Sequence, residues 1–192
     1  MRRLHLLPLL VLVSASFAPI TSAQTPAAKP VPTLRWVLLA QLQSTHNKAE
    51  WFVPIDTAVA GLTPEQAKWV PTNAKGKLDP DASHSVGMLA YHLLFWNTRA
   101  LEQMKGEKPA AAPSNNEETF NDFDAATWAK TVHDLDAVMT SLEDFVAHAD
   151  DATLTKLAPT IAHIGTHNAY HTGQILYVRK LQGSWNPANG VK

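Results

Sequence analysis

The sequence predicts an all-α protein, a four-helix bundle with long connections between some of its helices. Three observations support this fold class. Apolar residues recur at three- and four-residue steps in four segments. Glycine, proline and capping residues mark the ends of these segments, and no segment alternates between apolar and polar residues as a half-buried strand would. With 45% hydrophobic residues, the 192-residue chain can bury a core of its own.

The first 23 residues have the three parts of a secretory signal peptide. Arg2 and Arg3 give a positive start, the stretch from Leu4 to Val13 is largely apolar, and small residues lead to a cleavage site after Ala23. The apolar stretch is shorter than the roughly 20 residues that a membrane span needs. We therefore expect cleavage after Ala23, a periplasmic or secreted protein, and no membrane span after cleavage.

The remaining chain divides into three parts. Residues 24–33 form a proline-rich spacer, residues 34–182 form one helical-bundle domain, and residues 183–192 form a C-terminal tail. The domain opens with a stripe of apolar residues that predicts a helix from Leu34 to Ala60. Pro54 lacks a backbone donor and is expected to kink or split this helix.

A capping box predicts a short helical turn at residues 63–66, where Thr63 can cap the turn and Pro64 takes its first position. Residues 71–80 contain glycine and prolines and are expected to form a loop. The second long helix is predicted from Ser85 to Lys105. It is apolar over much of its surface, which places it at the centre of the bundle.

Two further long helices are predicted in the second half of the chain. Residues 108–121 are polar, contain proline and are expected to be a connection. The third helix runs from Ala125 to Ala147. The fourth runs from Leu157 to Leu181, with Pro159 in its first turn and Gly183 after its end.

Composition excludes several classes of function. The formal net charge is −1, and removal of the signal peptide makes the chain more acidic, so no basic surface is expected for nucleic acid. The chain has no cysteine, which excludes disulfides and thiolate metal sites. It also lacks the Gly-x-Ser-x-Gly elbow of serine hydrolases and the repeated Glu-x-x-His pattern of di-iron bundles.

Three histidines stand four residues apart on the fourth predicted helix, namely His163, His167 and His171. This spacing places neighbouring side chains on one helix face, with Cβ atoms about 5–6 Å apart, so either pair could chelate a metal ion. The residue after His167 is Asn168, and the glutamate base of the His-Glu-x-x-His zinc proteases is therefore missing. Spacing alone does not choose between the two pairs.

A third ligand has to come from another helix, and His92 is the natural candidate. It lies in the apolar middle of the second helix, where an unpaired imidazole would be costly. A metal ion would satisfy it, and so would a hydrogen bond to a neighbour. The role of His46 stays open, whereas His84 is expected to cap a helix or lie on the surface. His133 and His148 have no partner at ligand spacing.

The segment from His167 to Ile175, His-Asn-Ala-Tyr-His-Thr-Gly-Gln-Ile, resembles the His-x-x-x-His-x-Gly-Gln-hydrophobic signature of the DinB-like superfamily. A second stretch agrees with the same family. It consists of a Gly-Leu-Thr turn at residues 61–67, a proline loop at residues 69–71 and a helix with one histidine at residues 84–96. The resemblance runs over roughly Leu34 to Leu181.

This resemblance implies an up-down-down-up four-helix bundle and a metal site. The family's three ligands carry over onto His92, His167 and His171, and its usual metals are zinc and nickel. Many members are homodimers. Gln174 would position a ligand, Gly173 would let a neighbouring helix approach, and the remaining candidates for supporting or alternative ligands are His163 and His46.

The expected function is that of an exported metal-dependent hydrolase or transferase acting on a small molecule. Three histidines with one open position are typical of catalytic zinc sites. The alternative is a metal- or ligand-binding helical module without turnover. Tyr91, Tyr170 and Glu102 are candidates for a general base by proximity in sequence. Protonation of the imidazoles predicts that metal binding weakens below about pH 6.5.

Overall fold

The computed structural model describes residues 31–73, 75–78, 84–121 and 123–190, which fold as the all-α protein that the sequence predicts. Among these residues no strand forms, and one isolated bridge pairs Thr72 with Leu78. The predicted signal peptide and most of the predicted spacer lie outside the described residues. None of the described helices is long and apolar enough to cross a membrane.

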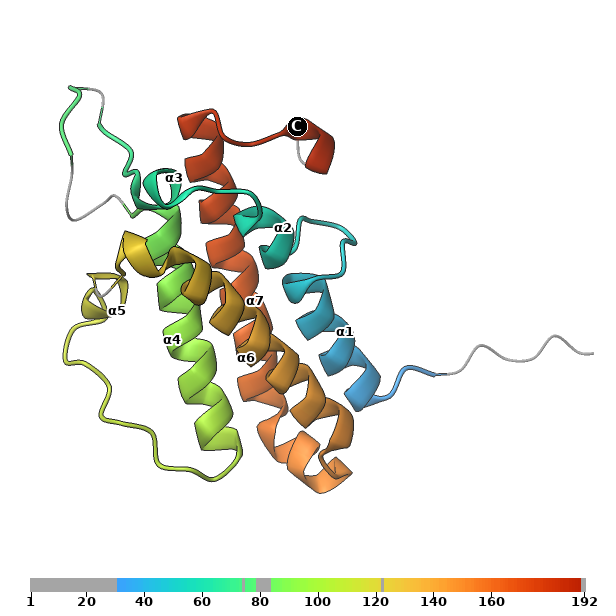
Figure 1. Ribbon diagram of the computed structural model, residues 1–192. Helices are drawn as coiled ribbons and strands as arrows, with labels where there is room; N and C mark the ends of the chain where they lie inside the picture. The colour runs from blue at the N-terminus through green and yellow to red at the C-terminus, as the bar shows by residue number, and fades with distance from the viewer. Residues whose placement is uncertain (1–30, 74, 79–83, 122, 191–192) are drawn as a thin grey trace, which may run out of the picture. The chain divides into compact units, whose positions relative to one another are not determined.

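Four long helices form the bundle: α1 (Leu34–His46), α4 (Val86–Met104), α6 (Trp128–His148) and α7 (Asp151–Gln182). Helices α1 and α4 each pack against both α6 and α7. The chain runs one way along α1, the opposite way along α4 and α6, and back again along α7 (Figure 1). This is the up-down-down-up order that the family resemblance implies, and it requires a long return connection between α4 and α6.

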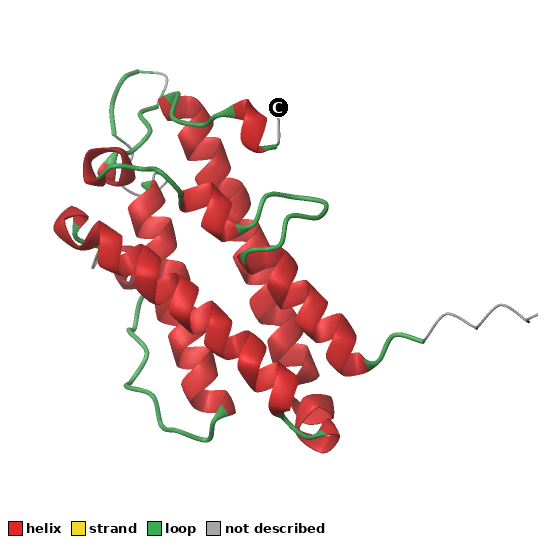
Figure 2. Cartoon of the chain, turned by 45° about the vertical axis from the view of Figure 1, so that its right-hand side comes forward, coloured by secondary structure: helices red, strands yellow, loops and turns green. Residues whose placement is uncertain are grey.

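Five short helical segments lie in the connections and the tail. They are α2 (Ile55–Val59), α3 (Pro64–Lys68), α5 (Glu118–Asn121) and the 3₁₀ turns η1 (Ala125–Thr127) and η2 (Pro187–Asn189). The turn η1 runs directly into α6, whereas loops separate the other short segments from the long helices (Figure 2). The α4–α6 connection carries α5, which packs against α4.

Helix α1 is shorter than the predicted helix from Leu34 to Ala60. Thr33 caps its start by accepting a hydrogen bond from the backbone of Trp36, and the helix ends at His46. The helical path resumes at α2, whose N-cap is Pro54. Proline disfavours helical geometry in the residue before it, so the chain extends there and buries Val53 before α2 begins.

The predicted capping box of α3 is confirmed, and α4 also begins with a side-chain cap. Thr63 and Gln66 form both hydrogen bonds of the capping box at the start of α3. Ser85 accepts a hydrogen bond from the backbone of Met88 at the start of α4. These caps place the beginning of α4, and hence His92 in its second turn, at a defined position in the bundle.

Helix α7 begins earlier than predicted. Asp150 caps it by accepting a hydrogen bond from Thr153, so the helix starts at Asp151 and not at Leu157. Pro159 is therefore inside the helix, not in its first turn. The strong cap at Asp150 explains the difference, because it fixes the first turn independently of the proline. Gly183 ends the helix in the left-handed conformation, with φ of 76°.

Residues 108–121 are not only a connection, because their last four residues form α5. Thr119 and Phe120 of this helix are buried against α4. The segment was predicted to be irregular because it is polar and α5 is too short to show an apolar period. As a result, two residues that face the histidines come from a part of the chain without a helical pattern.

The close approach between α1 and α7 occurs at Gly165, not at the predicted Gly173. A Cβ atom at Gly165 would lie 2.8 Å from the Cγ and Cδ atoms of Gln41 on α1, whereas one at Gly173 would have no atom within 4 Å. Gly173 is exposed on α7. The glycine of the signature is therefore not required for helix packing in this chain.

Candidate metal centre

The structure brings His92 of α4 together with His167 and His171 of α7. One ring nitrogen of each lies within 4.8 Å of the other two, and the two Nε2 atoms of His92 and His167 are 3.2 Å apart. The side chains are largely removed from solvent, since His92 is 2% exposed and His171 is 7% exposed. Three imidazoles thus converge on one point between two packed helices.

The local geometry follows from the helices. His167 and His171 are four residues apart, so their rings lie on one face of α7 with centroids 4.6 Å apart. Helix α4 packs against this face and brings the ring centroid of His92 to 4.6 Å from that of His171 and 5.2 Å from that of His167. The arrangement needs no loop residue, which makes it rigid.

Thr119 of α5 fixes the orientation of His92. The Nδ1 atom of His92 lies 2.6 Å from Oγ1 of Thr119, and this hydroxyl donates its own hydrogen to the carbonyl oxygen of Asn116 at 2.6 Å. The hydroxyl oxygen is therefore the acceptor for the His92 Nδ1–H group. With its proton held on Nδ1, the imidazole presents an Nε2 lone pair to the other two histidines.

Gln174 does the same for His171. The Nδ1 atom of His171 lies 2.6 Å from Oε1 of Gln174, one turn further along α7. The Nε2 group of Gln174 donates to the hydroxyl of Tyr170 at 3.3 Å, which orients the amide so that its oxygen faces His171. Hydrogen-bond acceptors behind the ring nitrogens are typical of histidines that ligate metals.

Burial keeps all three imidazoles neutral. Burial, together with the charges that His171, His167 and His84 would carry, lowers the pKa of His92 to about 3. Burial also lowers the pKa of His171 to about 4, with a contribution from His167, and lowers the pKa of His167. Because metal ions bind the neutral form, these shifts favour coordination at neutral pH.

The three histidines fit a divalent cation. Their free nitrogens are within 4.8 Å of one another, which suits convergence on an ion with nitrogen distances of about 2.0–2.1 Å. Two of the rings are oriented by acceptors on their far side. Among the described residues, no carboxylate joins these three histidines as a ligand, so one or more coordination positions stay open for water or substrate.

A cavity of about 790 Å³ opens beside the three histidines. Aromatic side chains, Trp96, Phe120 and Tyr170, contribute to its wall. Phe120 stacks on His92 with ring centroids 3.9 Å apart and planes 6° apart, so α5 forms the wall next to the ligand. The three histidines therefore form a candidate metal site that faces a pocket of small-molecule size.

His84 is part of this cavity, although its position in the sequence predicted a cap or a surface residue. Its ring stacks on Phe120 with centroids 4.0 Å apart, and its Nε2 atom lies 3.1 Å from Oε2 of Glu117. Both His84 and Glu117 line the cavity. Little in the sequence indicates this pair, because Glu117 belongs to the polar segment before α5.

The other candidates lie in different places. His163 lines the cavity but is exposed and does not belong to the group of three ligand atoms. His46 lies in a separate cluster with Asp56 and Asp136. Of the residues considered as a general base, Tyr170 lines the main cavity, whereas Tyr91 and Glu102 line another cavity of about 290 Å³.

Comparison with known protein families identifies a match. The family model of the DinB superfamily matches residues 55–175, which is more than half of the chain and includes all three histidines of the site. Neither the curated proteins nor the solved structures contain a match.

Proposed function

The chain belongs to the DinB superfamily, and we propose that it binds one divalent metal ion through His92, His167 and His171. The bound ion would serve to hydrolyse a small molecule or to transfer a group from it. The convergence of three neutral imidazoles at the wall of a cavity carries this proposal. A metal site with four protein ligands is typically structural, whereas three protein ligands beside a cavity leave a coordination position for water or substrate, as in catalytic sites.

Zinc and nickel are the metals that the family resemblance implies, and imidazole nitrogen suits both ions. When bound, either ion supplies a Lewis acid that polarises a substrate oxygen and acidifies water. The protein contributes the fixed donor geometry. Thr119 and Gln174 hold the rings of His92 and His171, so the ligands need not reorganise when the ion enters.

The pair of His84 and Glu117 would accept a proton from a group bound in the cavity. The Nε2–H group of His84 donates to Glu117, so Nδ1 is left as a proton acceptor beside the cavity. Glu117 would stabilise the imidazolium that forms when His84 takes a proton. We assign His84 as the general base on this geometry, in place of Tyr91 and Glu102, which line the smaller cavity.

The cavity indicates a small substrate with apolar parts. Its volume of about 790 Å³ falls within the range of about 300–1,000 Å³ that small-molecule sites have. Trp96, Phe120 and Tyr170 offer flat apolar surfaces, and neither lysine nor arginine is among the described residues that line it. The negative charge of a strongly anionic substrate would therefore be balanced mainly by the metal ion.

The test is turnover by zinc- or nickel-loaded protein against a panel of esters, amides and thiol conjugates. We expect one class to react, His167→Ala to abolish the reaction, and His84→Asn to lower kcat while metal content stays at the wild-type level. If the loaded protein binds members of the panel and converts none, the chain is a metal- or ligand-binding module. His133→Asn, an exposed histidine on α6, is the matched control.

We propose further that the protein acts outside the cytoplasm. Support comes from the signal-peptide pattern of residues 1–23. N-terminal sequencing of protein recovered from the periplasm would find Gln24 as the first residue. An intact Met1 on that protein would contradict cleavage.

A further inference from the structure

A second cluster of metal-type ligands lies around His46, separate from the three histidines described above. His46 ends α1, Asp56 is on α2, and Asp136 and Glu143 are on α6. One ligand atom each from His46, Asp56 and Asp136 lies within 4.8 Å of the other two. Three helices that are separate in sequence therefore bring an imidazole and two carboxylates to one point.

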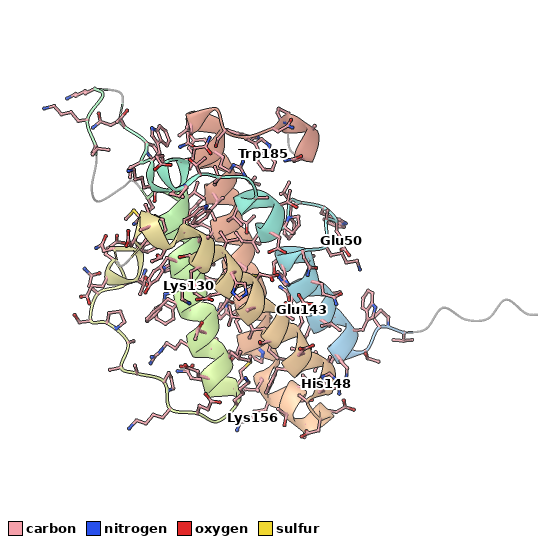
Figure 3. The ribbon with its side chains drawn as sticks, in the orientation of Figure 1. Glu50, Lys130, Glu143, His148, Lys156 and Trp185 are labelled. Carbon is pink, nitrogen blue, oxygen red and sulfur yellow. The ribbon has the colours of Figure 1, made fainter. Side chains whose placement is uncertain are left out.

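His46 is completely enclosed, with 1% of its surface exposed, and both of its ring nitrogens face carboxylates. Its Nδ1 atom lies 2.6 Å from Oε1 of Glu143, which Figure 3 labels on α6 where that helix passes α1. Its Nε2 atom lies 2.9 Å from Oδ1 of Asp136 and 3.7 Å from Oδ1 of Asp56. One ring nitrogen thus meets one carboxylate, and the other meets two.

The cluster has more negative charge than His46 can balance. Within the described part of the chain, Asp56, Asp136 and Glu143 form ion pairs with His46 alone. A protonated imidazole would cancel one of these three charges. The charges of the other two carboxylates would stay unbalanced.

We propose that His46, Asp56 and Asp136 bind a second divalent transition-metal ion, with zinc as the ion to test. The Nε2 atom of His46 and one oxygen of each aspartate would be the ligands, at distances of about 2.0–2.2 Å. Binding would release the Nε2 proton to solvent and leave Nδ1–H donating to Glu143. A carboxylate behind a ligating histidine is a common arrangement in zinc sites.

The surroundings of the cluster fit such an ion. The side chains of Asp56 and Asp136 are 38% and 55% exposed, so an ion can enter from solvent and water can complete its coordination. The ion would remove the charge excess that His46 leaves. It would also tie α1 to α2 and α6, so this second site is expected to stabilise the fold and to contribute nothing to the cavity beside His92.

The test uses tag-free mature protein incubated with zinc and freed of loosely bound ions by gel filtration. Elemental analysis is expected to find about two zinc ions per chain in the wild type and about one in His167→Ala. The double variant Asp56→Asn/Asp136→Asn is also expected to hold about one, and the combined triple variant none. Asp134→Asn removes an α6 carboxylate that pairs with Lys130 and is the matched control, expected to keep both ions.

Asparagine is chosen because it keeps the size of aspartate and removes repulsion, so these variants are expected to fold; circular dichroism checks this. As a second readout, zinc is expected to raise the Tm of His167→Ala, and this rise should vanish in the triple variant. If His167→Ala holds no zinc and shows no rise in Tm, the second site does not exist and the cluster is an ion-pair network. That result would leave the three-histidine site intact, because each site is removed by its own variant.

Discussion

The hydrogen bond between Nδ1 of His171 and Oε1 of Gln174, 2.6 Å long, joins a histidine of the candidate metal site to the residue one turn further along α7. It fixes which nitrogen of His171 carries the proton and which faces the metal position. Gln174 is itself held by Tyr170. The chain Tyr170–Gln174–His171 therefore sets the geometry of the site from one helix face.

Removal of this acceptor is expected to weaken metal binding. Gln174→Ala should raise the Kd for zinc by about 10–100-fold, because the imidazole of His171 loses its fixed tautomer and orientation. Gln174→Glu keeps an acceptor oxygen and should bind zinc at least as tightly as the wild type. Competition with a chromogenic chelator, in the Asp56→Asn/Asp136→Asn background, measures the three-histidine site alone. An unchanged Kd in Gln174→Ala would show that the hydrogen bond has no part in ligation.

Thr119 offers the equivalent test for His92. Thr119→Val has nearly the same shape but no acceptor for the buried Nδ1–H group, so the free energy of unfolding should fall by about 1–3 kcal/mol. The imidazole can escape this cost by moving its proton to Nε2, which would also weaken zinc binding. Thr119→Ser restores the hydroxyl and should recover both properties. Urea unfolding and zinc titration of the two variants check this. Equal stability and equal zinc affinity of Thr119→Val and Thr119→Ser would refute it.

The pH dependence of zinc binding is expected to differ from that of exposed histidines. An ordinary imidazole protonates near pH 6.5, whereas burial lowers the pKa of His92 to about 3 and that of His171 to about 4. Zinc affinity should therefore change little just below pH 6.5 and fall steeply only near pH 4, lower than the sequence alone predicts. Isothermal titration across this range tests it. A steep loss centred at pH 6.5 would mean that the imidazoles are not desolvated.

The metal-free protein should lose stability on acidification for the same reason. Between pH 6.5 and about pH 4 the unfolded chain takes up protons on His92 and His171 while the folded chain does not, so the free energy of unfolding falls as the pH falls. His46 acts in the opposite direction: its pKa is raised, burial being outweighed by Glu143, Asp136 and Asp56, and its contribution is lost as the pH rises. The variant His171→Asn, unfolded in urea at several pH values, should show a smaller loss than the wild type.

The two glycines of α7 are expected to respond differently to substitution. Gly173→Ala should stabilise the protein by about 0.5–1 kcal/mol, because alanine favours the helix and its Cβ atom meets nothing. Gly165→Ala should be less stable than Gly173→Ala by about 1–3 kcal/mol, since its Cβ atom would displace Gln41. Urea unfolding of the two variants gives the comparison. The reverse order would show that α1 and α7 do not meet at Gly165.

The long helices could be predicted from the sequence because each carries an apolar stripe over many turns. Their ends were predicted best where a cap is strong, as at Thr63 and Ser85. The end of α1 at His46 was not predicted, because no glycine or proline precedes Pro54 within this segment. The start of α7 was also missed, since the cap at Asp150 outweighs the signal of Pro159.

Part of the candidate site could also be predicted from the sequence. The spacing of His167 and His171 predicts a shared face, and the apolar surroundings of His92 predict a partner. The choice against His163 came from the family signature and not from spacing. The supporting residue Thr119 could not be predicted, because it lies 27 residues from His92 in a polar segment and meets it only after α5 packs on α4. The contact between His46 and Glu143 spans 97 residues and leaves no local pattern.

The central claim is that His92, His167 and His171 hold a divalent metal ion, and the most direct measurement is the metal content of tag-free mature protein. Elemental analysis of the wild type and of His167→Ala, purified side by side, should differ by about one zinc or nickel ion per chain. This difference does not depend on the second site, which both proteins keep. Equal metal content in the two folded proteins would contradict the assignment of the three histidines as a metal site.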